Sequence, residues 1–145
     1  MQFKLFLAIT YLMVFVKKSA ETTERLSEVL NLQAMVSLQR ENFSSSLEYL
    51  KRAEELTGTS LKLKATTLNN LACFYRRTGK LRTAYNYLQN AFELELKIGN
   101  CPSLADTHLN LCAVLSQLGK TWEILSFSFW FCSSKMKNMV LKDRH

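Results

Sequence analysis

The stretch TLNNLACFYRRTGKLRTAYNYLQNAFEL, residues 67–94, decides the fold because parts of it recur on both sides. Upstream, YLKRAEEL (49–56) aligns with YLQNAFEL (87–94) at an offset of 38 residues. Downstream, LNLCAVLSQLGK (109–120) aligns with NNLACFYRRTGK (69–80) at an offset of 40 residues. A self-similar unit of this length, with two helical patterns joined by a turn, predicts an array of stacked helices. Such an array favours a binding surface rather than an active site.

The composition indicates a folded and mainly helical chain without a basic binding face. Hydrophobic residues make up 48% of the 145 residues, and only four Gly and one Pro are present to make turns. The net charge of +7 is concentrated at the ends, because residues 21–120 carry twelve basic and ten acidic side chains. A nearly neutral middle argues against nucleic-acid binding, which needs clustered Lys and Arg beside exposed aromatic side chains.

Residues 61–78 and 81–98 have the periodicity of two helices separated by Gly79. The apolar face of the first helix consists of Leu68, Leu71, Ala72 and Tyr75. The inward face of the second consists of Leu81, Ala84, Leu88, Ala91 and Leu94. Gly99 is placed to end the second helix in a left-handed conformation, and Pro102 suits the first turn of the next helix. Each hairpin buries only one face by itself, so its neighbours must stack on it.

At these positions the chain resembles the tetratricopeptide repeat family. That family's pattern of large, small and aromatic residues is filled here by Leu68, Leu71, Ala72, Tyr75, Ala84, Leu88 and Ala91, with Gly79 at the turn. Leu96 stands where the pattern has proline, and the offsets of 38 and 40 exceed the family's minimal repeat of roughly 34 residues. Long repeats with LNNLA, here residues 68–72, are similar to the kinesin light chain type. The resemblance implies an all-α, right-handed solenoid of stacked helix-turn-helix hairpins, and a scaffold role in cytoskeletal transport or cilia.

The resemblance covers residues 24–120 and weakens away from the central repeat. We divide the chain into an apolar N-terminal segment (1–20), a degenerate repeat (21–60), a clear repeat (61–100), the first helix of a third repeat (101–120) and a divergent C-terminal helix or tail (121–145). In the degenerate repeat, Ser37, Glu41 and Ser46 replace the aromatic residue, the turn glycine and the small residue. The third repeat keeps the pattern at Leu111, Cys112, Leu115 and Gly119, but then has Ile124 and Phe131 where the central repeat has Ala84 and Ala91.

The two ends leave alternatives open. Residues 5–16 form an apolar run that has the length of a signal-peptide core and is too short to span a bilayer. Either it is a secretory signal cleaved after Ala20, with Asn42 in a glycosylation sequon, or it is a helix packed on the first repeat or an ill-fitting start of a transcript variant. After Lys120 the chain is either a divergent cap or the tail of a truncated product. Its cluster of Phe127, Phe129, Trp130 and Phe131 would shield Leu111 and Leu115 only imperfectly and offers a surface for self-association.

The candidate binding site is one face of the first helix in each repeat. In the family that this chain resembles, those helices line a concave groove, and Asn70 and Asn110 occupy positions that face it. Side-chain amides both donate and accept, so a ladder of them can hold the backbone of an extended peptide. By the same geometry the further candidates are Asn31, Thr66, Asn69, Arg76, Arg77, Asp106 and Gln117. Arg76 and Arg77 favour an acidic or carboxylate-bearing peptide. The alternative is that all of these are only solvated helix faces.

Catalytic and metal sites find little support. His108 and Cys112 lie four residues apart, near Asp106, but they match the inward Leu68 and Ala72 of the central repeat, so we expect packing rather than catalysis. The cysteines at 73, 101, 112 and 132 lack CxxC spacing and are expected to be reduced, with no metal or cofactor. Asp106 and Asn110 stand where chaperone-binding members of the family carry cations, which disfavours that role. We expect a non-catalytic, cytoplasmic module that binds a protein or peptide, without a nucleic-acid or membrane partner, the alternative being the secretory pathway.

Overall fold

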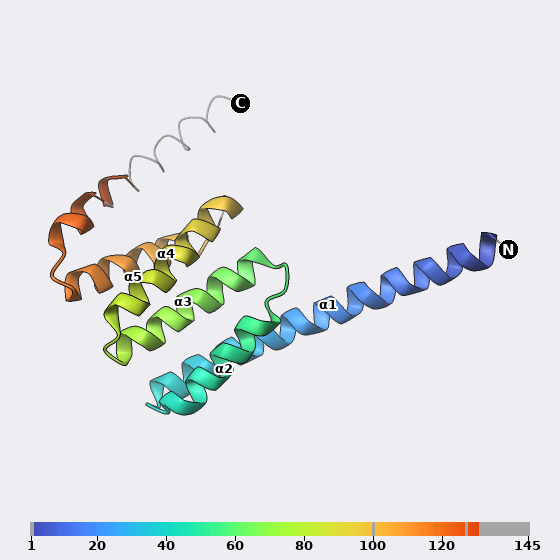
Figure 1. Ribbon diagram of the computed structural model, residues 1–145, viewed down its shortest axis with the longest axis horizontal. Coiled ribbons are helices and arrows are strands. Elements are labelled where there is room, and N and C mark those ends of the chain that lie inside the picture. The colour runs from blue at the N-terminus through green and yellow to red at the C-terminus, as the bar shows by residue number, and fades with distance from the viewer. Residues whose placement is uncertain (1, 100, 127, 131–145) are drawn as a thin grey trace, which may run out of the picture.

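The computed structural model describes residues 2–99, 101–126 and 128–130, and this part of the chain consists of helices joined by short turns (Figure 1). The helices, in order, are α1 (Gln2–Gln39), α2 (Phe43–Leu56), α3 (Leu61–Arg77), α4 (Leu81–Ile98) and α5 (Leu104–Gln117). A further helical segment covers residues 121–126 and 128–130. The predicted all-α class is therefore confirmed, and the described residues contain no strand.

Short turns join the helices, so that each helix packs on the one before it (Figure 1). In addition α3 contacts α1, and α5 contacts α3. Two clusters of buried side chains form the core. The first holds Ala34, Leu38, Leu50, Leu71 and Phe74, and the second holds Ala72, Ala84, Leu88, Phe92, Leu111 and Val114. Because α3 contributes to both clusters, it connects the N-terminal hairpin to the C-terminal one.

The predicted inward faces are correct for most positions of the central repeat. The side chains of Leu68, Leu71, Ala72, Ala84, Leu88 and Ala91 are buried. The prediction was wrong for Leu94, which is half-buried, whereas the next residue, Glu95, is fully buried. Steps of three and four residues keep a side chain on the same helix face, so the row through Ala84, Leu88 and Ala91 continues to Glu95. Tyr75 is also only half-buried, and its ring stacks on that of Tyr87 with centroids 5.3 Å apart.

The turn predicted at Gly79 belongs to a motif that occurs three times in the described part of the chain. Glu41, Gly79 and Gly119 have φ angles of 61°, 78° and 72°. In each turn the next backbone N–H donates to a carbonyl five residues earlier, over 2.9, 2.8 and 2.9 Å for Asn42 to Ser37, Lys80 to Tyr75 and Lys120 to Leu115. This is the hydrogen bond of a Schellman helix end. Glu41 therefore takes the left-handed conformation in spite of its side chain.

The end of α4 and the start of α5 differ slightly from the sequence prediction. Gly99 follows α4 with a φ of 82°, as a glycine at a helix end permits, but its ψ of −85° lies outside the left-handed helical region. Helix α5 starts at Leu104, so Pro102 lies in the turn before the helix rather than in its first turn. Residue 100, between Gly99 and Cys101, lies outside the described part of the chain.

The apolar N-terminal segment is the first half of α1 rather than a separate element. No Gly or Pro interrupts Gln2–Gln39, and the N-terminal half projects beyond the other helices (Figure 1). Residues 9–20 are all exposed, among them Tyr11, Leu12 and Phe15, so the alternative in which this segment packs on the first repeat does not hold for these residues. In the described part of the chain, no helix has both the length and the apolar character required to span a membrane.

The segment after Lys120 packs at the end of the molecule. Ile124 is half-buried, and the Trp130 ring contacts Phe92 with centroids 6.0 Å apart. Leu111 and Leu115 are buried, although their cover was expected to be poor. The predictions for Phe127, Phe131 and Cys132 fall outside the described residues.

Candidate functional site

Side-chain amides connect α1 to α3. Asn31 on α1 donates from Nδ2 to Oγ1 of Thr67 over 2.9 Å. The Oδ1 atom of Asn31 accepts a hydrogen bond from Nδ2 of Asn70 over 2.9 Å. One asparagine is thus held between a threonine and an asparagine that lie three residues apart on the next helix, and we call this arrangement the amide clamp.

The same clamp connects α3 to α5. Asn69 donates from Nδ2 to Oγ1 of Thr107 over 3.0 Å, and its Oδ1 accepts from Nδ2 of Asn110 over 3.0 Å. Asn31 corresponds to Asn69 at the offset of 38, and Thr67 and Asn70 correspond to Thr107 and Asn110 at the offset of 40. The repeat that is visible in the sequence is therefore also a repeat of hydrogen-bond geometry.

The clamp determines which of the predicted groove residues are available to a ligand. Asn31 is 4% exposed, so its assignment to a groove was wrong: its amide serves the α1–α3 contact. Asn69, Asn70 and Asn110 are half-buried. Both ends of the Asn69 amide are used within the chain. Asn70 and Asn110 are each anchored through Nδ2, and among the described residues their Oδ1 atoms accept no hydrogen bond.

A buried carboxyl group supports the second clamp. Glu95 on α4 is completely buried, and its Oε1 accepts hydrogen bonds from Oγ of Ser103 over 2.5 Å and from Oγ1 of Thr107 over 3.1 Å. Thr107 thus donates to Glu95 and accepts from Asn69, which fixes its hydroxyl group. Glu95 is not among the site residues predicted from the sequence, although its place in the row through Ala84, Leu88 and Ala91 was a sufficient signal.

In the described part of the chain, the remaining candidates form no hydrogen bond with a clamp residue. Nη1 of Arg77 donates to the Leu38 carbonyl over 2.9 Å, and Nη2 lies 4.0 Å from Oε1 of Glu41, so this cation binds the C-terminal end of α1. Thr66 donates to the Lys62 carbonyl of its own helix. Asp106 and Gln117 are exposed on α5.

Arg76 is half-buried and lies on the same side of α3 as the second clamp. Its Nε atom is buried and has no hydrogen-bond partner among the described residues. Burial raises the pKa of the Cys73 thiol, and the nearby positive charge of Arg76 opposes that rise. Sγ of Cys73 is in turn 4.0 Å from Nδ2 of Asn110. A guanidinium group therefore stands near one of the two available amides.

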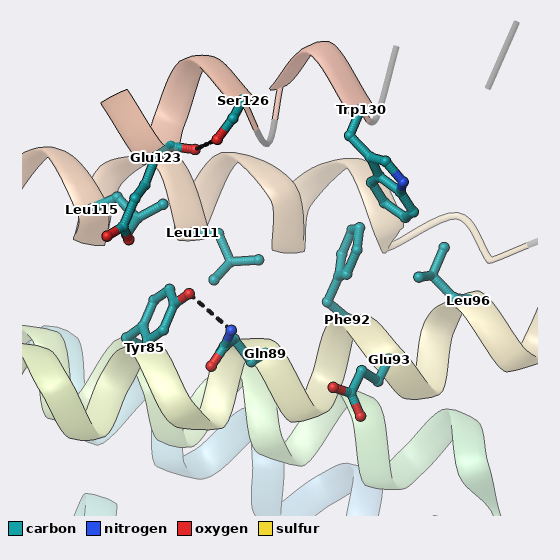
Figure 2. Close-up of a pocket in the computed structure, with 10 residues that line it drawn as sticks. All are labelled: Tyr85, Gln89, Phe92, Glu93, Leu96, Leu111, Leu115, Glu123, Ser126 and Trp130. Atoms are coloured by element: carbon teal, nitrogen blue, oxygen red, sulfur yellow. Dashed lines mark hydrogen bonds between the residues drawn. The ribbon is translucent and has the colours of Figure 1, made fainter. Parts of the chain in front are cut away.

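A hollow of about 580 Å³ lies between α4, α5 and the terminal segment (Figure 2). Its floor is apolar, and polar groups of Gln89, Glu93 and Glu123 stand at its rim. The ten residues that line it are Tyr85, Gln89, Phe92, Glu93, Leu96, Leu111, Leu115, Glu123, Ser126 and Trp130. Leu111 and Leu115 are thus buried but incompletely packed, because the bulky terminal segment does not fill the space above them.

The His108 and Cys112 pair is compatible with packing. Nδ1 of His108 and Sγ of Cys112 are 4.0 Å apart, both residues are half-buried, and burial lowers the pKa of His108. Sγ of Cys112 also lies 3.7 Å from Oγ of Ser128. Within the described ranges, no group of His, Cys, Asp and Glu is arranged to hold a metal ion.

No protein-family model matches the chain, and no curated protein matches it. The resemblance to the tetratricopeptide repeat family therefore rests on the residues of this chain alone.

Proposed function

We propose that the chain is a short tetratricopeptide-like array, a right-handed solenoid of helical hairpins, which binds an extended peptide or a helix of another protein and catalyses no reaction. Three observations support the array. The same turn geometry occurs three times, α3 contacts both α1 and α5, and the amide clamp occurs at both of those contacts. A repeated contact between every second helix is what a stack of hairpins requires.

The observation that carries the binding proposal is the state of Asn70 and Asn110. Each amide is anchored through its nitrogen, which fixes the orientation of the side chain before any ligand arrives. Each leaves an acceptor oxygen at equivalent positions on α3 and α5. Packed helix axes lie roughly 8–10 Å apart, and an extended peptide advances about 3.3 Å per residue. Two backbone N–H groups two residues apart point to the same side of an extended peptide and lie roughly 7 Å apart, so they can be shared between the two oxygens.

The charge near the second clamp favours an acidic peptide. Arg76 stands close to Cys73 and so to Asn110, whereas Arg77 is engaged by the end of α1. A half-buried guanidinium group forms stronger hydrogen bonds with a carboxylate than with a neutral acceptor. The acidic preference is therefore assigned to Arg76 alone.

Binding is tested with the purified full chain and labelled extended peptides of acidic, neutral and basic composition, followed by fluorescence anisotropy. Replacing Asn70 or Asn110 by Ala should weaken binding of the acidic peptides by about 2- to 10-fold, because a net hydrogen bond contributes roughly 0.5–1.5 kcal/mol. The matched control is Asn90→Ala, an exposed asparagine on α4, which should bind as the parent chain does. If the Asn70 and Asn110 variants bind normally, this face is not the site.

Asn70→Ala should also lower the stability of the folded chain. Because Asn70 donates to the buried Asn31, its removal leaves an acceptor of Asn31 without a partner and lowers the free energy of unfolding. Binding must therefore be measured below the start of thermal unfolding of each variant.

A secreted or membrane-associated chain is the rival proposal, and the exposure of apolar residues 9–16 on α1 favours it. The cytoplasmic, cytoskeletal or ciliary role follows only from the resemblance to kinesin light chains. Cell fractionation with N-terminal sequencing separates the two proposals. A mature product that starts at Glu21 and carries sugar on Asn42 would exclude the cytoplasmic one.

A further inference from the structure

The outer face of α1 has apolar side chains at the clamp positions. Subtracting the offset of 38 from Thr67 and Asn70 gives Val29 and Leu32, which are 49% and 68% exposed. The residue that corresponds to the buried Phe74 is Val36, which is also exposed. On α3 these positions form the face that contacts α1. On α1 the corresponding face is apolar and exposed.

The outer face of α5 has an apolar residue at the matching position. Adding the offset of 40 to Asn69, the central asparagine of the second clamp, gives Leu109, which is 65% exposed. A clamp has three positions: the central asparagine, and the threonine and asparagine on the next helix that bind it. These positions are polar at the α1–α3 and α3–α5 contacts, whereas the exposed counterparts on α1 and α5 are apolar.

The terminal segment extends the apolar surface at the α5 end. Trp122, Leu125 and Phe129 are exposed, recur at steps of three and four residues, and line one open hollow. Inside the chain, α3 packs on both helices of the preceding hairpin, and α5 packs on both α3 and α4. The first helix of each hairpin thus packs on both helices of the hairpin before it. A further helix added in the same way would contact α5 and the terminal segment.

We propose that this helix is α1 of a second copy of the chain, with Leu109 of one copy seated between Val29 and Leu32 of the next. The chain carries both halves of the contact at the same three positions, which argues for a second copy over an unrelated partner. An internal clamp asparagine placed against Val29 and Leu32 would leave its amide unsatisfied, so the apolar ends select one another. The projecting half of α1 lies beyond the ends of the other helices (Figure 1), and the side chains of Val29 and Leu32 remain exposed.

Such a contact joins two different faces of the molecule and is therefore head-to-tail. A contact of this kind that does not close into a ring produces open chains of copies. The inference uses the stacked arrangement of α1, α3 and α5 but not the binding of a peptide, so it stands if Asn70 and Asn110 bind nothing.

The test is the mass of the full chain against concentration, measured by sedimentation velocity. The parent chain should grow past a dimer as its concentration rises. Leu109→Glu and Leu32→Glu each place a charge at one end only, and each variant should associate at least about tenfold more weakly. The control is Leu61→Glu, which changes a similarly exposed leucine away from both ends and should associate as the parent does.

Mixing the two end variants tests the direction of the contact. The mixture contains one intact pair, Leu109 of the Leu32→Glu chain with Val29 and Leu32 of the Leu109→Glu chain, so a 1:1 mixture should form dimers and nothing larger. A parent chain that is monomeric at all concentrations, end variants that associate normally, or a mixture that stays monomeric would each overturn the proposal.

A further variant shows whether the register is the one proposed. Leu109→Asn combined with Val29→Thr and Leu32→Asn rebuilds the amide clamp between copies, and this triple variant should regain association that Leu109→Asn alone loses. Failure of the triple variant to recover, with a melting temperature equal to that of the parent, would show that the three positions do not meet.

Discussion

Glu41 occupies a turn position that favours glycine, and Glu41→Gly should stabilise the chain. Its φ of 61° costs a residue with a Cβ atom about 1–2 kcal/mol relative to glycine. Two terms reduce the gain: glycine loses about 0.5–1 kcal/mol more conformational freedom on folding, and the exposed pair with Arg77 contributes roughly 0–1 kcal/mol. The expected net gain is about 0.5 kcal/mol, a rise of roughly 1–2 °C in melting temperature for a chain of this size.

The reverse variant, Gly79→Glu, tests the same backbone preference at the equivalent turn. A Cβ atom at Gly79 would meet no atom within 4 Å, so steric overlap contributes nothing and the cost comes from the φ of 78°. That cost of about 1–2 kcal/mol is offset in part by the roughly 0.5–1 kcal/mol of extra conformational freedom that glycine loses on folding, so we expect a net loss of about 0.5–1 kcal/mol. Urea unfolding followed by circular dichroism measures both variants, and added salt should increase the gain from Glu41→Gly because it screens the pair with Arg77. A neutral Gly79→Glu would refute the reasoning, since it would mean that the turn does not require its positive φ.

Three further variants test packing and protonation. Ala84→Leu should lower the free energy of unfolding by about 1–3 kcal/mol, because the side chain is completely buried and overpacking forces its neighbours apart; thermal melting shows this directly. Ser126→Leu should raise it by about 1 kcal/mol by covering part of the apolar floor of the hollow in Figure 2, with reduced binding of an apolar dye as the second measurement. Burial lowers the pKa of His108 below 6.5, so the folded chain binds fewer protons than the unfolded chain, and stability should fall as the pH drops through 6.5. His108→Gln should flatten that dependence in urea titrations between about pH 8 and 5.

Features that depend on short stretches of sequence were predictable. The bounds of α4 match the predicted 81–98, and the turn at Gly79 lies where expected, because periodicity and a glycine in a helix end are local signals. The error at Leu94 and Glu95 came from preferring an apolar residue over the correct helical step. A buried glutamate is costly by itself, and its partners Ser103 and Thr107 lie on a later part of the chain.

The candidate site was only partly predictable, because amides on neighbouring helices serve each other. The sequence identified Asn31, Asn69, Asn70 and Asn110 as a set, but whether an amide points to a ligand or to the next helix depends on the distance between helices. The same limit applies to Val29, Leu32 and Leu109. In the sequence nothing distinguishes these residues from other exposed apolar residues. Only the hydrogen bonds of the clamp show that they occupy positions at which neighbouring helices meet.

The unbroken course of α1 has a mechanical consequence. At about 1.5 Å per residue, residues 2–20 extend roughly 28 Å away from the body, and no Gly or Pro provides a hinge between them and Ser27. Ser27 donates to the Ala53 carbonyl of α2, and Asn31 joins α1 to α3, so the helix is fastened to both neighbours just where its exposed half begins. A surface or partner that binds the apolar residues 9–16 would therefore fix the orientation of the whole array. A flexible linker in the same place would only limit its distance from that surface.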